Sequence, residues 1–322
     1  MSALFMVALL LLATTPWITD LGGTYKTNPK GAVTEASFRT TWIEDSDLRR
    51  VAALTELRTL DLAHTRITDL GFRSLKSLTH VESLDLWYAE QIGDGAVAVV
   101  RNWKTLKHLN LRGTKITDAG IALLADHPAL ESLDVGFSLF TDGGFEALTT
   151  LPRLRDLTAG GNKITDVGLN SLRLMPNLRR LDVSGTQRTD SGPWSATITD
   201  RAVEAIATLT QLEDLNLRSA KFTPAGAAKL KALKSLRTLD LSETQLTPAA
   251  LADLLPAFSS LERLALFNCK RLDDSAAAPL AAAAKHLRWL DLTGTKLSAA
   301  GIEQIRKANP ALQVLATGPG GA

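Results

Sequence analysis

Residues Leu57–Leu78 read LRTLDLAHTRITDLGFRSLKSL, and this stretch decides the fold. It opens with L-x-x-L-x-L. With Leu57 counted as position zero, a threonine follows at position eight and T-D-x-G begins at position eleven. The same pattern restarts, mostly 24 or 25 residues apart, at Val33, Val81, Leu106, Leu130, Leu154, Leu178, Leu212, Leu236, Leu261, Leu287 and Leu312. A repeat of this length predicts a solenoid, in which each unit supplies a short strand and a helix and is stabilised by its neighbours.

The residue types predict the strand and the turn of each repeat. Leucines at positions three and five share one face of the strand, so stacked repeats bury them beneath a parallel sheet. We expect the side chain at position eight to turn inward and hydrogen-bond the turn backbone. These residues are Thr41, Thr65, Thr114, Ser138, Asn162, Thr186, Thr244, Cys269 and Thr295.

A helix is predicted to begin at position eleven, where threonine is a favourable N-cap. The capping residues are Thr68, Thr117, Thr141, Thr165, Thr199, Thr223 and Thr247. A glycine recurs three residues later, although glycine costs a helix about 1 kcal/mol relative to alanine. We therefore expect the helix to approach the sheet closely at Gly71, Gly95, Gly120, Gly144, Gly168, Gly226 and Gly301.

These motifs resemble leucine-rich repeats of the cysteine-containing kind, found beside F-box domains and in bacterial proteins, and more loosely those of ribonuclease inhibitor. Ile116–Ile121 (ITDAGI) and Ile164–Leu169 (ITDVGL) match the family motif, and Cys269 occupies its cysteine position. Most repeats carry Thr there instead. The resemblance covers residues 33–317. It implies an α/β leucine-rich repeat solenoid (horseshoe), with a parallel β-sheet on the concave face, short helices on the convex face, and protein recognition through the concave sheet.

The pattern divides the chain into an apolar segment and cap (1–32), about 12 repeats (33–317) and a flexible tail (318–322). Ala3–Ala13 is an unbroken apolar run, which favours a signal peptide or anchor and a secreted or periplasmic protein, with membrane contact only through this segment if it is uncleaved. No Lys or Arg precedes the run and no Ala-x-Ala follows it. The alternative is a buried cap in a cytoplasmic protein, because Ile18–Gly22 repeats the letters of Ile67–Gly71.

One repeat is irregular. Leu178 and Leu212 are 34 residues apart, and the extra residues lie near 187–197. Thr189–Gly192 and Ile198–Ala202 both fit the helix-start motif, so we expect a short duplication with a loop at Gly192–Ser195. An exposed Trp194 there is a candidate partner contact, although loop insertions are also tolerated without any function.

Composition and motifs argue against several classes of function. The formal charge of +2 is too balanced to indicate a nucleic-acid partner, and a single cysteine excludes an internal disulfide framework. No catalytic or nucleotide-binding motif is present, and the five histidines fall at unrelated repeat positions. We therefore predict a monomer without enzymatic activity, cofactor or metal.

Two columns of charge are predicted on the sheet. Position one alternates in sign except between Arg155 and Arg179, which predicts a ladder of ion pairs between adjacent strands: Arg58, Glu82, Lys107, Glu131, Arg155, Arg179, Glu213, Arg237, Glu262 and Arg288. Position four carries Asp61, Asp85, Asp134, Asp182, Asp240 and Asp291 on the concave face. This acidic stripe is either a structural preference of the repeat or a means of steering a basic partner.

The candidate partner-binding site lies on repeats three to five. Trp87, Tyr88 and Phe137 occupy positions six and seven, where strands end, and the repeat between them contributes His108 and Arg112. Arg112 is one strand from Trp87 at the same position, so we expect the two to stack. The alternative is that Tyr88 and Phe137 turn inward, and a rival site is Phe267 with Trp289 near the carboxyl end.

The favoured function is a non-catalytic scaffold that binds a protein of unknown identity. The alternatives implied by the resemblance are the substrate-recognition subunit of a ubiquitin ligase and an inhibitor of a secreted hydrolase. No F-box-like segment precedes Val33 in this sequence, which weighs against a self-sufficient ligase adaptor.

Overall fold

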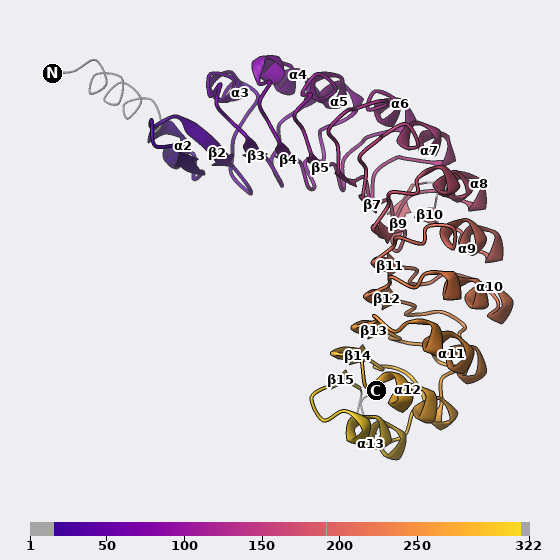
Figure 1. Ribbon diagram of the computed structural model, residues 1–322. Helices are drawn as coiled ribbons and strands as arrows, with labels where there is room; N and C mark the ends of the chain where they lie inside the picture. The colour runs from indigo at the N-terminus through magenta and orange to yellow at the C-terminus, as the bar shows by residue number, and fades with distance from the viewer. Residues whose placement is uncertain (1–15, 191, 317–322) are drawn as a thin grey trace. The chain divides into compact units, whose positions relative to one another are not determined.

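The computed structural model describes residues 16–190 and 192–316 of the 322. Contacts divide the chain into two compact units, Met1–Leu154 (unit 1) and Arg155–Ala322 (unit 2). The predicted apolar run at Ala3–Ala13 and the predicted tail at 318–322 lie outside the described residues. In both units short strands alternate with short helices, and the helices lie along one face of the sheet (Figure 1).

Unit 1 contains the first strands and helices of the described chain. These are α2 (Pro16–Asp20), β1 (Thr24–Thr27), β2 (Val33–Ser37), α3 (Leu48–Val51), β3 (Thr59–Asp61), α4 (Asp69–Phe72), the 3-10 helix η1 (Arg73–Ser77), β4 (Ser83–Asp85), α5 (Asp94–Val100), β5 (His108–Asn110), α6 (Asp118–Ala122), β6 (Ser132–Asp134) and α7 (Asp142–Leu148). β2 to β6 pair in parallel, each with the next.

Unit 2 continues the pattern. Its strands are β7 (Asp156–Thr158), β8 (Arg180–Asp182), β9 (Thr186–Thr189), β10 (Gly192–Ser195), β11 (Asp214–Asn216), β12 (Thr238–Asp240), β13 (Arg263–Ala265), β14 (Trp289–Asp291) and β15 (Gln313–Leu315). Its helices are α8 (Asp166–Asn170), η2 (Ser171–Leu174), α9 (Asp200–Ile206), α10 (Pro224–Lys229), η3 (Leu230–Ala232), α11 (Pro248–Leu254), η4 (Leu255–Ala257), η5 (Asp274–Ala276), α12 (Ala277–Ala283) and α13 (Ala299–Ala308). β7, β8 and β11 to β15 pair in parallel.

The core of each unit is the predicted column of leucines. In unit 1, Leu60, Leu84, Leu109 and Leu133 pair across successive strands and are buried. Position eight behaves as predicted in most repeats, because its side chain donates to the carbonyl three residues earlier. Examples are Thr65 to Leu62 (2.6 Å) and Thr244 to Leu241 (2.7 Å). The predicted α/β leucine-rich repeat solenoid is confirmed.

The amino-terminal end of unit 1 is closed by a cap. β1 pairs antiparallel with β2, whereas the strands that follow pair in parallel. Trp17 and Ile18 of α2 are buried, and Trp17 stacks on Phe38 with 5.6 Å between ring centroids. Residues 16–27 therefore precede the parallel strands as an antiparallel cap, and the choice between a signal or anchor and a buried cap for Ala3–Ala13 stays a prediction.

A ladder of threonine and aspartate, which we call the Thr–Asp ladder, links the helix starts. The predicted threonine N-caps are confirmed; Thr117, for example, accepts from the N–H of Ala119. The Asp after each cap also binds the capping residue of the next repeat, which was not predicted from the sequence. Asp94 accepts both the N–H (2.9 Å) and the hydroxyl (2.6 Å) of Thr117, the cap of the next repeat. The same pair of bonds joins Asp45 to Thr68, Asp118 to Thr141, Asp166 to Thr199 and Asp200 to Thr223.

The Thr–Asp ladder explains the helical glycines. A Cβ at Gly120 would lie 2.1 Å from the carboxylate of Asp94, and one at Gly226 would lie 2.0 Å from that of Asp200. The predicted close approach at this position is confirmed, but the sheet, which was the predicted partner, is not what the glycine contacts. The glycine contacts the ladder aspartate of the preceding repeat, which its two hydrogen bonds hold in place, and not the sheet.

The charge column at position one is confirmed in part: ion pairs form among Arg58, Glu82 and Lys107, between Arg179 and Glu213, and among Arg237, Glu262 and Arg288, whereas within the described residues Glu131 and Arg155 form none. Glu82 binds Arg58 and, at 2.7 Å, Lys107; Glu262 binds Arg237 at 3.0 Å and Arg288 at 3.3 Å. The hydrogen bonds from Lys107 and then Arg58 lower the pKa of Glu82 below its ordinary value. These groups are partly exposed, so the column fixes strand register more than it adds stability.

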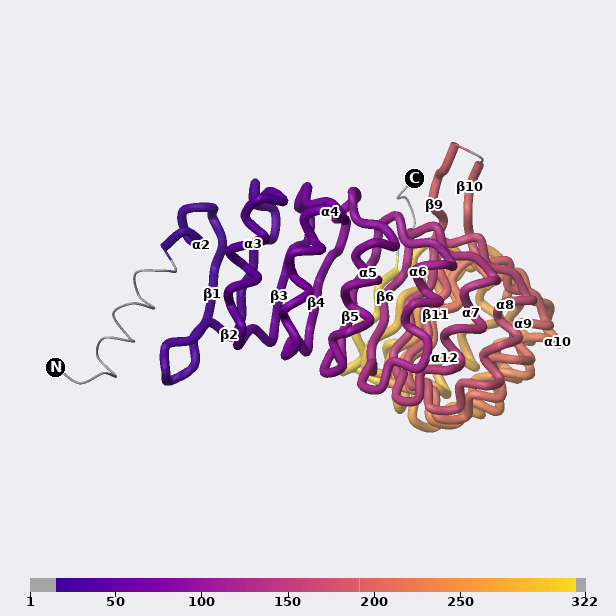
Figure 2. Tube along the Cα trace, turned by 90° about the horizontal axis from the view of Figure 1, so that it is seen from above, coloured from indigo at the N-terminus to yellow at the C-terminus, as the bar shows by residue number. Residues whose placement is uncertain are grey.

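The irregular repeat contains a hairpin. We expected a loop at Gly192–Ser195 and an inward-turning Thr186, and both expectations were wrong. β9 and β10 pair antiparallel, with Trp194 opposite Gln187 and Ser195 opposite an exposed Thr186. Ten additional residues are enough for two paired strands, which satisfy their own backbone hydrogen bonds. In Figure 2 the hairpin projects beyond the rest of unit 2.

Candidate functional site

The outward face of the sheet, which we call the strand face, carries the predicted aspartates. Oδ1 of Asp61, Asp85 and Asp134 accepts from the backbone N–H two residues later, at 3.0, 2.9 and 2.8 Å. Asp182, Asp240 and Asp291 form the same bond in unit 2. The stripe therefore caps the turns after the strands, which supports its interpretation as a structural preference of the repeat. Attraction of a basic partner stays a prediction.

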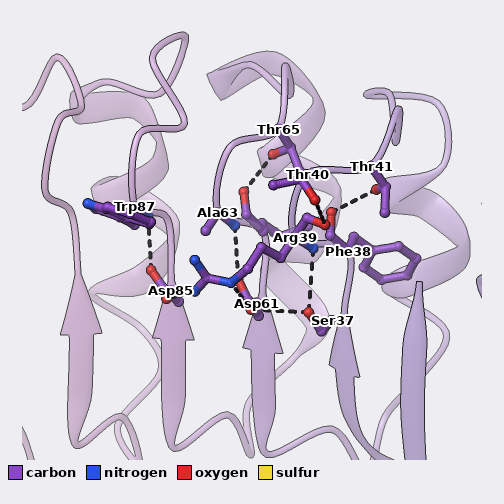
Figure 3. Close-up of polar contacts among 11 residues, drawn as sticks. Ser37, Phe38, Arg39, Thr40, Thr41, Asp61, Ala63, Thr65, Asp85 and Trp87 are labelled. Atoms are coloured by element: carbon purple, nitrogen blue, oxygen red, sulfur yellow. Dashed lines mark hydrogen bonds and ion pairs between the residues drawn. The ribbon is translucent and has the colours of Figure 1, made fainter. Parts of the chain in front are cut away.

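Arg39 crosses the strand face in unit 1. Its guanidinium donates to Asp61 (2.9 Å) and to Asp85, two repeats away, and lies 5.6 Å from the ring centroid of Trp87. Figure 3 shows the side chain extending past Ala63, whose small methyl group leaves the path open. Partial burial lowers the pKa of Arg39, but Asp61 and then Asp85 outweigh that effect and raise it. Arg39 therefore neutralises this part of the acidic stripe.

Three rings gather where β3 and β4 end. His64 lies edge-on to Trp87 (4.6 Å between centroids) and stacks on Tyr88 at 5.6 Å with an interplanar angle of 6°. Trp87 and Tyr88 are also edge-to-face, at 5.5 Å. The ring of Tyr88 covers Gly113 of the next repeat, where a Cβ would lie 2.8 Å from it. The rings are thus packed against one another while His64 is exposed and the other two are half-buried.

Arg112 belongs to the neighbouring pair. We expected it to stack on Trp87, and this was wrong: its guanidinium lies 4.4 Å from the ring centroid of Phe137 and 3.8 Å from a carboxylate oxygen of Asp134. The inward orientation considered for Tyr88 and Phe137 is not adopted, because both side chains stay half-exposed. The rings and guanidiniums lie at neighbouring strand ends in two groups, which together we call the aromatic row: Arg39, His64, Trp87 and Tyr88, and then Arg112 with Phe137.

The backbone at position seven is left-handed, which explains why the rings stand out from the sheet. The residue at this position is Gly113, Gly161, Gly185 or Gly294 in four repeats and Thr40, Ser219, Glu243 or Asn268 in four others. In the aromatic row His64 (φ 54°), Tyr88 (φ 51°) and Phe137 (φ 54°) adopt the same conformation. A bulky residue there is strained by about 1–3 kcal/mol, and such strain concentrates at functional positions.

Two predicted residues are not members of the row. His108 is exposed at the start of β5, four residues before Arg112, so it stands about 13 Å away along the extended chain. Trp194 lies on the β9–β10 hairpin of unit 2 and is half-buried, where an exposed ring was expected. The rival residues in unit 2 also meet guanidiniums, Phe267 with Arg218 at 5.0 Å and Trp289 with Arg263 at 4.6 Å.

Sequence reasoning missed Arg39 and His64. Both occupy the columns that identified Trp87 and Tyr88, positions six and seven, two repeats and one repeat earlier. Extending those columns to the first repeats would have found them.

Among the described residues, no group of three or more His, Cys, Asp or Glu could hold a metal ion. No helix in the described ranges is long and apolar enough to span a bilayer.

Comparison with known proteins agrees with the repeat fold. The family profile described as "Leucine Rich repeat" matches residues 53–76 and 104–125. A search of curated protein sequences gives no significant match.

Solved structures share the fold at low identity. An internalin (InlF) from Listeria monocytogenes is 23% identical over 84% of this chain and 70% of its own, with a TM-score of 0.62. Internalin C2 from the same organism is 22% identical over 71% and 89%, with a TM-score of 0.51. A chain of the Rad7 and Elc1 complex in yeast is 16% identical over 85% and 72%, with a TM-score of 0.56. These similarities show the leucine-rich repeat fold.

Proposed function

We propose that this chain is a non-catalytic interaction scaffold that binds a protein partner through the aromatic row of unit 1. The carrying observation is the conformation of His64, Tyr88 and Phe137. Each holds a large ring at a left-handed position, where the other repeats with this conformation carry glycine or one of the non-aromatic residues Thr40, Ser219, Glu243 and Asn268. Strain of this kind concentrates at functional positions, and partly exposed rings beside arginine are the groups that dominate protein interfaces.

The surface around the row fits a protein partner. Arg39 and Arg112 present their guanidiniums beside aromatic faces, while Asp61, Asp85 and Asp134 hold the turns rigid. A rigid platform loses little conformational entropy on binding, which favours affinity. One of the solved structures of this fold is itself a complex of two proteins, Rad7 with Elc1.

The test uses a probe that can be made without identifying the partner. A phage-displayed library of random peptides is panned against the purified protein, and the selected peptides are synthesised and titrated. Changing Trp87 and Arg112 to Ala together is expected to weaken binding by at least about 2 kcal/mol, roughly 30-fold, while the melting temperature barely moves. Phe267→Ala is the matched control, because that ring also stacks on an arginine.

Two outcomes would overturn the assignment. Peptides whose affinity is unchanged by the Trp87 and Arg112 substitutions but falls with Phe267→Ala or Trp289→Ala would place the site in unit 2. A library that yields no peptide dependent on either site would argue against peptide recognition by the strand face.

We also propose that residues 1–15 direct export, on the strength of the apolar run Ala3–Ala13. Because Trp17 and Ile18 pack in the cap, we expect any cleavage to fall before Pro16. Fractionation of a bacterial culture expressing the native chain, followed by amino-terminal sequencing, tests this. Uncleaved chain recovered only from the cytosol would contradict it.

A further inference from the structure

A shallow hollow of about 390 Å³ lies beside the aromatic row, on the edge of unit 1 formed by the turns after β3 and β4. It is lined by His64, Thr65, Arg66, Tyr88, Glu90 and Gln91. Thr65 is buried and donates to Leu62, whereas His64, Arg66, Glu90 and Gln91 are exposed. The hollow is therefore a polar recess with rings along one side.

The groups around this hollow have few partners of their own. Within residues 16–190 and 192–316, no ion pair is formed by Arg66 or Glu90, and no hydrogen bond is formed by the His64 ring or the Tyr88 hydroxyl. Gln91 accepts only a long contact of 3.5 Å from Lys115. By contrast, Arg39 and Arg112 on the strand face are both paired with carboxylates. The unpaired groups converge on one space, as in a binding site.

Trp42 adds an apolar contact on the far side of Arg66. Its ring is 75% exposed, and the guanidinium of Arg66 lies 4.9 Å from its centroid. Trp42 and Arg66 occupy the same position, nine, of adjacent repeats. An exposed Trp stacked with an Arg that has no carboxylate partner is the pairing that interface hot spots favour. The stacking also holds the guanidinium in place, so less entropy is lost when it binds.

Charge selects the kind of group that the hollow would take. Position nine in unit 1 carries Arg66, Glu90 and Lys115, together with the uncharged Trp42 and Leu139, so the edge is positive by one charge. The lining of the hollow holds one guanidinium, that of Arg66, and one carboxylate, that of Glu90, together with the Tyr88 hydroxyl and the Gln91 amide, each of which can donate or accept. A guanidinium matches a carboxylate in shape and charge.

We propose that this hollow receives an acidic side chain of the protein partner, which pairs with Arg66 while a neighbouring apolar residue covers the open face of Trp42. The proposal rests on the proposed function and deepens it, because it names the chemistry of the segment that binds next to the aromatic row. The partner's segment is thus an acidic residue close to an aromatic or aliphatic one, lying over the edge of the sheet.

The experiment uses the full-length protein and the same random-peptide library. The selected peptides are expected to be enriched in Asp or Glu beside an apolar residue. Arg66→Glu is expected to weaken these peptides about 10-fold or more, because it turns an attraction into a repulsion. Lys221→Glu is the matched control. It makes an equal change of charge at position nine of an exposed turn in unit 2 and is expected to leave affinity unchanged.

A charge swap gives a readout that a folding defect cannot mimic. A peptide in which the acidic residue is replaced by Lys is expected to bind Arg66→Glu better than wild type. Trp42→Ala is expected to weaken the original peptide about 5-fold or more, while the melting temperature stays within about 1 °C because the ring is exposed.

Failure of this inference is distinguishable from failure of the proposed function. Peptides that depend on Trp87 and Arg112 but tolerate Arg66→Glu would overturn the acidic contact and leave the aromatic row as the site. Enrichment of basic peptides, dependent on Glu90, would overturn it as well. If no selected peptide depends on the row, both proposals fall together.

Discussion

Asp94 holds both hydrogen-bonding groups of Thr117, the capping residue of the next helix, with its two carboxylate oxygens at 2.9 and 2.6 Å. One side chain thereby orders the helix start of the repeat after its own. Asp94→Ala is expected to destabilise the protein by about 2 kcal/mol, because two partly buried donors lose their acceptor. Urea unfolding measures this. Glu146→Ala, on an exposed position of α7, is the control with an expected change below about 0.5 kcal/mol. An equal effect of the two changes would contradict the role of the Thr–Asp ladder.

Gly120→Ala is expected to destabilise the protein, although alanine is the better helix former by about 1 kcal/mol. The new Cβ would lie 2.1 Å from the Asp94 carboxylate and would displace it from Thr117. In the background of Asp94→Ala the same change is expected to become neutral or stabilising, since the obstacle is gone. A double-mutant cycle measures this coupling. Additive effects would show that Gly120 is retained for another reason.

Thr40→Gly is expected to stabilise the protein by about 1 kcal/mol. Thr40 is exposed, β-branched and left-handed (φ 60°), and its hydroxyl contacts only the carbonyl of Arg39. Gly113→Ala, at the same position (φ 71°), is expected to destabilise by at least as much, because its Cβ would also meet the ring of Tyr88. Calorimetry gives both shifts in melting temperature. A loss of stability in Thr40→Gly would show that position seven is not strained.

Acidification is expected to destabilise unit 1 through His127. The side chain is buried; its Nε2 donates to the carbonyl of Trp103 at 3.1 Å, and burial lowers its pKa, with Lys104 acting in the same direction. The unfolded chain therefore takes up this proton first as the pH falls. Stability is lost as the pH decreases below the unfolded value of about 6.5. Melting temperatures at pH 7.5 and 5.0 are expected to differ less in His127→Gln than in wild type, whereas His80→Asn, at an exposed histidine, leaves the difference unchanged.

Cys269 is expected to be inert to thiol reagents in the folded protein. It is buried at position eight beside Thr244 (3.7 Å), and burial raises the pKa of its thiol. Labelling with 5,5′-dithiobis(2-nitrobenzoate) is expected to follow unfolding in urea. Rapid labelling in native buffer would show that the region around β13 opens without global unfolding.

The sequence predicted those features that arise within one repeat. Leucine spacing determined the strands, and Thr followed by Asp determined the helix starts, because both depend on contacts between residues close in the chain. The path of Arg39 was not predictable in this way. It reaches Asp85 two repeats away, past Ala63 of the repeat between them. The left-handed position seven was not predicted because only four repeats carry glycine there, while the others carry aromatic or polar residues.

The candidate site was predicted in part for a related reason. Trp87, Tyr88, Arg112 and Phe137 were found from their rarity and residue type, and they do line one edge of the sheet. The pairing of each ring with its guanidinium was not predicted, because strand spacing shows which side chains are close enough to meet but not where they point. His64 was overlooked because histidines were judged as metal ligands and not as rings.

The Thr–Asp ladder continues without interruption across the repeat that contains the β9–β10 hairpin. Asp166 holds Thr199 across 33 residues through the same two bonds that join Asp94 to Thr117 across 23. The segment between a strand end and the next helix start can therefore be longer than in the regular repeats without loss of these two bonds. Foreign sequence such as an epitope or a second binding loop can be grafted between Gly185 and Ile198, where the fold already accommodates an insertion and the repeats on either side keep their register.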